Sequence, residues 1–167
     1  MANKYIKNSS GTLAEQEATV TSAGAGNAGQ IIALDATGKL DNSVLPTGIG
    51  ADTAIVAASE GLAAGDFVNI HNSSGAKVRK ADATTAGKEA HGFVLQSVIS
   101  GANATVYFEG TNTQVTGATG GLVFLSTTAG GFSSSAPTAS GNIVQKIGVA
   151  VSATAINFEG QQPIILA

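Results

Sequence analysis

Hydrophobic residues occur in short runs from about residue 51 to the end of the chain, separated by turns rich in Gly, Asn, Ser and Thr. Runs of Val, Ile and Phe at this spacing are typical of strands in a small barrel or sandwich. No segment keeps the 3.6-residue period of an amphipathic helix, so the pattern predicts an all-β domain. The expected strands cover residues 53–57, 66–71, 76–80, 91–98, 105–109, 122–126, 143–151, 155–159 and 163–166.

The pattern repeats within this domain. VYFEG at 106–110 returns as INFEG at 156–160, and GDFVNI at 65–70 returns as GGLVFL at 120–125. The matching pieces follow the same order in both halves, which indicates two similar units of about 50 residues each. The repeated glycines are Gly75 with Gly130 and Gly92 with Gly148, and the units cover about 60–112 and 115–162.

One such unit cannot bury both faces of its strands alone. The repetition therefore predicts a small pseudo-two-fold β-barrel or sandwich in which the two units close against each other. Glu109 and Glu159 occupy equivalent strand ends that face away from the core, so we expect an architectural repeat and no catalytic pair of acids. The shared core is expected to contain Phe67, Phe108, Leu122 and Phe158.

Residues 1–50 differ from the rest and predict an N-terminal arm or linker that is partly extended, with the β domain at 51–167. TLAE at 12–15 has the spacing of a capping box, which favours a helical turn or two through Ala18. The stretch 21–29 has the glycine-rich composition of a linker. An apolar strand at 31–34 and a turn at 35–38 come next, and Pro46 lies shortly before the boundary.

Ordering a polar segment such as 1–29 costs about 1–2 kcal/mol per residue in backbone entropy, so we expect it to order only against a partner. An extended arm can add a strand to a neighbouring protein through main-chain hydrogen bonds. The side chains expected to contact that partner are Tyr5, Ile6, Leu13, Ile31, Ile32 and Leu34.

Charged residues make up 11% of the chain, against about 25% in an ordinary soluble domain. A surface this poor in charge favours packing against further copies or a partner. The net charge of −3 argues against a nucleic-acid partner, because phosphates require clustered Lys and Arg. Lys77, Arg79 and Lys80 do cluster, but their alternation is typical of the exposed side of a strand.

The candidate chemical motifs do not form a catalytic, cofactor-binding or metal-binding set. GAGNAG at 24–29 fits a dinucleotide motif, but a β-like run comes after it instead of a helix. His71 and His91 lack the partners of a metal site, and Glu89 beside His91 favours a surface hydrogen bond. The serines at 132–138 have no elbow motif or placed histidine. No cysteine is present, so disulfides and thiol chemistry are excluded.

Several segments of the domain resemble head decoration (capsid cement) proteins of tailed bacteriophages, over roughly residues 50–167. The segments that carry the resemblance are AGDFV, KADATTAG, GFVLQ, GANATVYFEG, GLVFLST and KIGVAVS. Separately, IIALDATGKLDNSVLP at 31–46 is similar to a motif of phage fibre proteins that joins a stalk to the next segment of the fibre. Both resemblances imply a virion protein, at different places on the particle.

The first resemblance implies a non-enzymatic homotrimer on the capsid surface that stabilises contacts between major capsid subunits. Its partners would be its own copies and the major capsid protein, with no cofactor, nucleic acid or membrane. The alternative is a head or tail fibre or collar component with residues 1–50 as a trimeric stalk. A carbohydrate-binding module or hydrolase subunit would need acidic and aromatic residues in one cleft. The N-terminus has no apolar signal-peptide segment, so synthesis in the host cytoplasm without export is expected.

Overall fold

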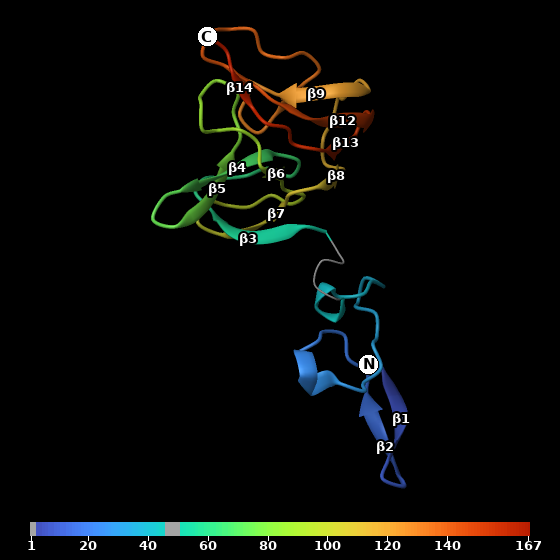
Figure 1. Ribbon diagram of the computed structural model, residues 1–167. Helices are drawn as coiled ribbons and strands as arrows, with labels where there is room; N and C mark the ends of the chain where they lie inside the picture. Colours follow the sequence, from blue (N-terminus) through green and yellow to red (C-terminus); the bar gives the residue numbers. More distant parts are fainter. Residues whose placement is uncertain (1–2, 46–50) are drawn as a thin grey trace. The chain divides into compact units, whose positions relative to one another are not determined.

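The computed structural model describes residues 3–45 and 51–167 (Figure 1). The chain divides into two compact units, Met1–Gly50 and Ala51–Ala167. The described residues form β-strands and two short 3-10 helices, and they contain no α-helix. The prediction of an all-β protein is confirmed.

Unit Met1–Gly50 begins with an antiparallel hairpin of β1 (Lys4–Ser9) and β2 (Thr12–Glu17). The expected helical turn through Ala18 is therefore wrong. Ser10 and Gly11 join the strands with φ of 53° and 89°, the backbone of a two-residue hairpin turn. This turn sets the register between β1 and β2. Residues 12–15, which have the capping-box spacing, lie in strand β2 instead of a helix.

The rest of this unit contains two 3-10 helices, η1 (Gly24–Asn27) and η2 (Asn42–Val44). The expected strand at 31–34 is wrong, because Ile32 forms only an isolated parallel bridge with Thr19. The predicted turn at 35–38 is confirmed, with the Gly38 amide donating to the Asp35 carbonyl at 3.0 Å. Among residues 3–45 only Ala33 is a buried hydrophobic residue.

Unit Ala51–Ala167 begins with five strands that close on themselves in the order β3-β5-β4-β6-β7. Neighbouring strands are antiparallel, except that β3 and β5 are parallel. The predicted turn between β4 and β5 is confirmed, with Gly75 at φ 104°. The expected strand at 91–98 shortens to two residues. The strands are β3 (Thr53–Ala58), β4 (Phe67–Asn72), β5 (Ala76–Lys80), β6 (Gly92–Phe93) and β7 (Asn103–Tyr107).

A second sheet of five strands comes next, in the order β10-β9-β12-β13-β8, and all of its pairs are antiparallel. A separate short pair, β11 (Ile143–Val144) with β14 (Ile164–Ile165), accompanies it. In Figure 1, β9, β12 and β13 of this sheet lie side by side. The strands of the second sheet are β8 (Gly110–Asn112), β9 (Gly121–Leu125), β10 (Phe132–Ser133), β12 (Lys146–Ser152) and β13 (Ala155–Phe158).

The two sequence repeats have the same pairing registers. In the first, β4, β6 and β7 are neighbours, and in the second, β9, β12 and β13 are neighbours. The first repeat pairs Val68 with Gly92 and Phe93 with Tyr107. The second repeat pairs Val123 with Gly148 and Val149 with Asn157. These are the pairs that the sequence match makes equivalent, so the repeat extends to strand order and register.

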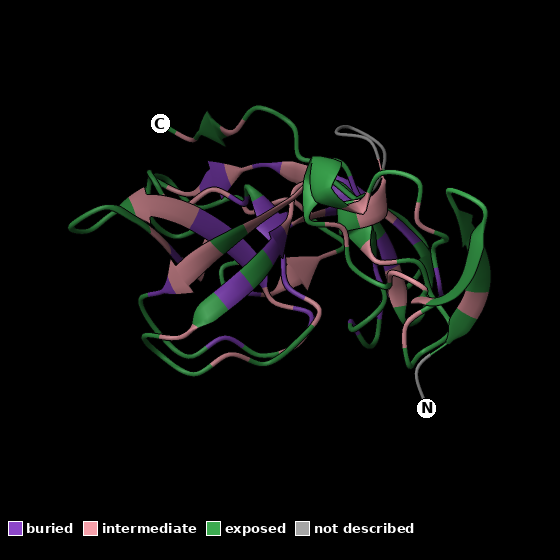
Figure 2. Cartoon of the chain, turned by 90° about the horizontal axis from the view of Figure 1, so that it is seen from below, coloured by how far each residue is buried: buried purple, intermediate pink, exposed green. Residues whose placement is uncertain are grey.

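The hydrophobic core of this unit has two clusters, and the buried positions follow its strands (Figure 2). One cluster lies inside the barrel, with Val68 and Val106 buried and Phe108 partly buried against them. The other joins the barrel to the second sheet and contains Phe67 and Phe158. Leu122 is 54% exposed. The expectation of one shared core is therefore wrong, because the closed barrel has an interior of its own.

Candidate functional site

The predicted partner-contact residues all lie in unit Met1–Gly50 and come from two parts of it. Ile6 and Leu13 share one face of the hairpin, because Ile6 is opposite Glu15 and Leu13 is opposite Asn8. Their exposures are 65% and 71%. Tyr5 projects from the other face, and its hydroxyl is buried without a hydrogen-bond partner among the described residues.

Ile31, Ile32 and Leu34 follow the turn of η1, and each is about half exposed. Backbone hydrogen bonds hold this segment beside Thr19, whose amide donates to the Ile31 carbonyl at 2.9 Å. The Asn27 side-chain amide donates to Gln30 Oε1 at 3.0 Å. Polar contacts therefore fix the segment while its apolar side chains stay exposed to solvent.

The fibre-like segment is shaped by two aspartates. The Asp35 carboxylate accepts from the amides of Lys39 at 2.9 Å and Thr37 at 2.8 Å. These hydrogen bonds, that of Lys39 foremost, lower the pKa of Asp35 from its ordinary value of 3.8. Hydrogen bonds from Ser43 lower the pKa of Asp41 in the same way and cap η2. Leu40, 49% exposed, lies between the two turns.

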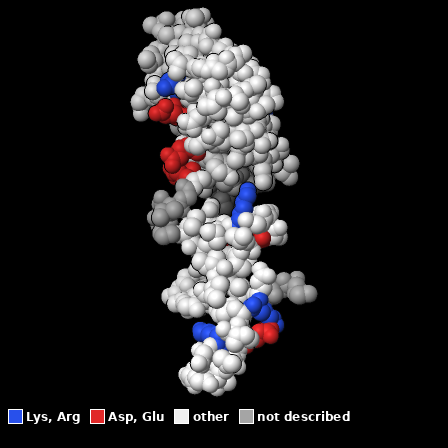
Figure 3. Space-filling model, turned by 90° about the vertical axis from the view of Figure 1, so that its right-hand side faces the viewer, with Lys and Arg blue, Asp and Glu red and all other residues white. Residues whose placement is uncertain are grey.

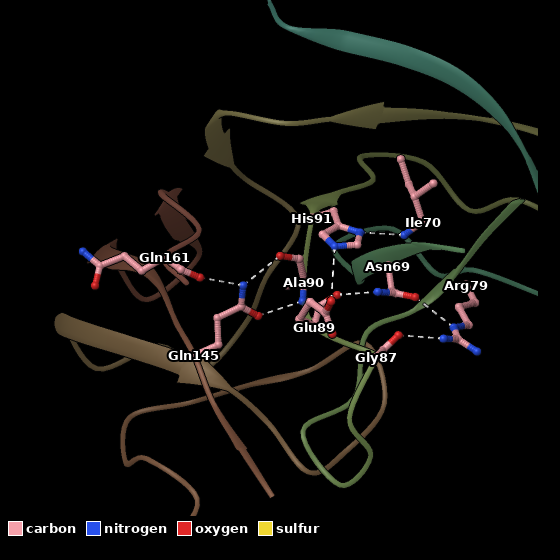
Figure 4. A network of polar contacts seen from close by, with 9 residues as sticks. All are labelled: Asn69, Ile70, Arg79, Gly87, Glu89, Ala90, His91, Gln145 and Gln161. Atoms are coloured by element: carbon pink, nitrogen blue, oxygen red, sulfur yellow. Dashed lines mark hydrogen bonds and ion pairs between the residues drawn. The ribbon is translucent and has the colours of Figure 1, made fainter. Parts of the chain in front are cut away.

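In unit Ala51–Ala167 a network of polar contacts surrounds the segment before β6 (Figure 4). Gln145 is 3% exposed, and its Oε1 accepts from the Ala90 amide at 2.7 Å. Its Nε2 donates to the carbonyls of Ala90 at 2.9 Å and Gln161 at 3.0 Å. One side chain therefore replaces the strand hydrogen bonds that these backbone groups lack.

Asn69 performs a similar function on the barrel side of the same segment (Figure 4). Its Nδ2 donates to the Glu89 carbonyl at 2.8 Å, and its Oδ1 accepts from Arg79 Nε at 3.0 Å. The Arg79 guanidinium also donates to the Gly87 carbonyl at 2.8 Å. Arg79 therefore holds a loop by specific hydrogen bonds, a role that the alternation of charges did not predict.

His91 belongs to this network and also lines a hollow on the unit's surface (Figure 4). Its Nδ1 accepts from the Ile70 amide at 3.0 Å, which requires the neutral tautomer with the proton on Nε2. That nitrogen lies 3.7 Å from Glu89 Oε1, so the pair predicted from the spacing is in contact, beyond hydrogen-bond distance. Among the described residues no group of three His, Cys, Asp or Glu side chains could hold a metal ion.

Two hollows of about 510 and 590 Å³ adjoin at the ends of the Phe-Glu-Gly segments and share Phe108, Phe158 and Gly160. The second is also lined by Glu109 and Glu159, because β8 pairs with β13 and brings the two segments side by side. The sequence did not predict this proximity. Both glutamates are exposed, and Glu159 lies 3.7 Å from Lys146 Nζ. The absence of a catalytic acid pair stays a prediction.

Ser59 and His71 form a second contact that the sequence did not predict, with Ser59 Oγ 3.0 Å from His71 Nε2. Burial foremost, and then the Arg79 charge, lower the pKa of His71, while Glu60 opposes the shift. No carboxylate of the described residues hydrogen-bonds its other ring nitrogen. The pair therefore lacks the third group that orients a catalytic histidine.

The described part of the chain contains no helix long and apolar enough to cross a membrane. No protein-family model, curated protein sequence or solved structure matches this chain.

Proposed function

We propose that this chain is a non-enzymatic structural protein of a phage virion, which binds the outside of the capsid as a homotrimer and stabilises contacts between major capsid subunits. It would act at the capsid surface and would need no cofactor. One observation carries the proposal. Unit Met1–Gly50 forms strands and turns, yet most of its described apolar side chains are exposed to solvent.

The energetics favour attachment through this unit. Covering a large aliphatic side chain contributes about 1.5–3 kcal/mol, and Ile6, Leu13 and Ile31 are all more than half exposed. Three copies of such an arm bind cooperatively, because attachment of one raises the effective concentration of the others. Modest contacts for each chain then give tight binding of the trimer.

The surface of unit Ala51–Ala167 also supports an assembly role. Figure 3 shows a broad surface of this unit without charged side chains. A protein that remains a dispersed monomer ordinarily carries more surface charge. Such a surface suits contacts with further copies or with a shell of subunits.

Capsid binding is tested by co-sedimentation with particles that lack this protein. The chain without residues 1–29 should keep its folded β unit and lose most of its capsid binding. A matched pair of variants refines the test, with Ile6→Asp and Leu13→Asp together expected to weaken binding. Ile55→Asp, which changes a residue 73% exposed in the other unit, should leave it unchanged. Equal binding by the truncated chain would show that the arm is not the attachment device.

A head or tail fibre or collar component, with residues 1–50 as a trimeric stalk, is the second candidate. The observation that favours it is the order of the fibre-like segment, where Asp35 and Asp41 shape the backbone while Leu34 and Leu40 stay exposed. Negative-stain images of virions with a labelled antibody separate the two candidates. Labelling over the whole shell supports decoration, and labelling of an appendage supports a fibre.

We also propose that the β unit arose from two copies of one unit, at about 60–112 and 115–162. The equal registers around Gly92 and Gly148 support this repetition. A pseudo-two-fold barrel or sandwich made by the two copies stays a prediction. The equivalent residues Phe67 and Leu122 have different surroundings, since one is buried and the other is exposed.

A further inference from the structure

The second repeat has one covered and one open sheet face. Residues paired directly across antiparallel strands project to the same face, and β9, β12 and β13 align Leu122, Val149 and Asn157. Val151 lies at the β12 register shift between Ala150 and Ser152, and its exposure places it with these residues and not with the packed ones. We call the face of these four residues the outer face. Leu122 is 54% exposed and Val151 is 62% exposed.

The opposite face of the same strands is fully packed. Val123, Ala150 and Ile156 alternate with the outer-face residues and belong to the cluster that joins the second sheet to the barrel. The strands therefore have apolar residues on both faces, which is typical of strands covered on both sides. A sheet with one solvated face ordinarily alternates apolar with polar residues instead.

The equivalent face of the first repeat is buried. The residues that correspond to Leu122 and Val149 are Phe67 and Phe93, which are 0% and 1% exposed. Both pack against Phe158 of the second repeat, with ring centroids 5.9 and 5.8 Å apart. In the first copy of the unit this face is thus an interface with another copy of the unit, whereas in the second copy Leu122 and Val151 are exposed among the described residues.

The charges on these strands permit contact between this face and a second copy of the chain. Among the residues of β9, β12 and β13 only Lys146 is ionisable, and its Nζ lies 3.7 Å from Glu159 Oε2. Two copies brought together here would not place unpaired like charges in contact. An interface with a highly charged partner would instead call for complementary charges on these strands.

We propose that the outer face of β9, β12 and β13 is a self-association surface, and that a second copy of this chain covers it. The proposal rests on the homotrimer of the proposed function, whose contact surface it names, and it does not depend on capsid binding. Leu122 and Val151 would be the central apolar contacts, because they are the most exposed aliphatic residues of the face.

The first test measures mass in solution. Full-length protein should sediment at a multiple of 16.4 kDa at micromolar concentration. Replacing Leu122→Lys and Val151→Lys together should weaken self-association by about tenfold or more and shift the protein toward the monomer. Ile99→Lys, a matched control at a residue 79% exposed and outside the face, should keep the wild-type mass.

The second test does not depend on the lysine variants. The chain has no cysteine, so Leu122→Cys introduces a single thiol. A short bismaleimide should link copies through Leu122→Cys and not through Ile99→Cys. If the lysine variant keeps the wild-type oligomeric mass and Leu122→Cys does not cross-link, this surface assignment is wrong and the homotrimer stands. A wild-type protein that is monomeric at all concentrations overturns both.

Discussion

Gly92 and Gly148 show how the two repeats depend on single residues. A Cβ atom on Gly92 would collide with the Tyr107 carbonyl oxygen, and one on Gly148 would collide with that of Asn157. Tyr107 and Asn157 are equivalent in the two Phe-Glu-Gly segments. Each glycine therefore permits the same close approach to the backbone of the neighbouring strand, which explains why the sequence has a glycine at both positions.

We predict that Gly92→Ala destabilises the β unit by about 1–3 kcal/mol, because the added methyl group overlaps backbone that cannot move freely. Gly148→Ala should cost at least as much, since φ there is 150° and an L-residue adds strain. Gly61→Ala is the control, because an added Cβ meets no atom within 4 Å there. Urea unfolding of the three variants measures the differences. Equal stability of Gly92→Ala and Gly61→Ala would contradict the crowding argument.

Phe158 and Phe108 are equivalent in sequence and differ in burial. Phe158 is 4% exposed and contacts two aromatic rings, whereas Phe108 is half-buried at the edge of the barrel cluster. We predict that Phe158→Ala costs about 3–5 kcal/mol and that Phe108→Ala costs clearly less. Thermal and chemical unfolding of the two variants decide. A larger effect at Phe108 would show that the barrel interior is the main core.

Gln145 satisfies three backbone groups with one amide, and the two groups of Ala90 are buried. Gln145→Leu keeps the side-chain size and leaves these groups without partners, so we predict a loss of about 1–3 kcal/mol or more in the free energy of unfolding. Gln162→Leu, at an exposed position beside the same hollow, is the control and should have little effect. A stable Gln145→Leu variant would mean that water or backbone movement replaces the amide.

At the scale of elements, most strands of the β unit were predictable because apolar runs and glycine turns are local signals. β5 at Ala76–Lys80 has the predicted bounds. The hairpin of β1 and β2 was missed, although Ser10 and Gly11 contain a turn signal, because the capping-box spacing competed with it. The parallel pairing of β3 with β5, through Ala57 with Lys77, joins distant segments and has no local signal.

The turn at Asp35 should depend on pH in a defined direction. Its pKa in the folded chain is below the ordinary 3.8, so the carboxylate stabilises the turn fully above pH 3.8. This stabilisation is lost as the pH falls through the lowered pKa of the folded state. NMR titration of the Thr37 and Lys39 amides should show a midpoint below 3.8. Asp35→Asn should remove the transition, and a midpoint at or above 3.8 would contradict the hydrogen-bonded turn.

At the scale of the whole chain, the sequence predicted a repeat but not how its copies would be buried. Phe67 and Leu122 match in sequence, and the same local pattern predicts the same burial for both. Their burial differs because the first copy closes into a barrel whose β4 and β6 pack against the second sheet, and the second copy remains an open sheet. The candidate contact residues Ile6 and Leu13 were predictable as sparse apolar positions, whereas the hollows required the β8–β13 pairing.

The distribution of buried residues gives a final prediction for the isolated β unit. Every buried hydrophobic residue of the described chain except Ala33 lies in Ala51–Ala167. The stability of this unit should therefore not require residues 1–50, since hydrophobic burial is the main favourable contribution to folding. We predict that a fragment of residues 51–167 unfolds in one cooperative transition, with a melting temperature within about 2 °C of the full chain. Such a difference is smaller than the shift in melting temperature that a stability loss of about 1 kcal/mol would cause. Differential scanning calorimetry at matched concentration makes the comparison, with the fragment carrying Phe158→Ala as a control for a destabilised fold. A fall as large as that of this control would show that residues 1–50 are part of the folded core.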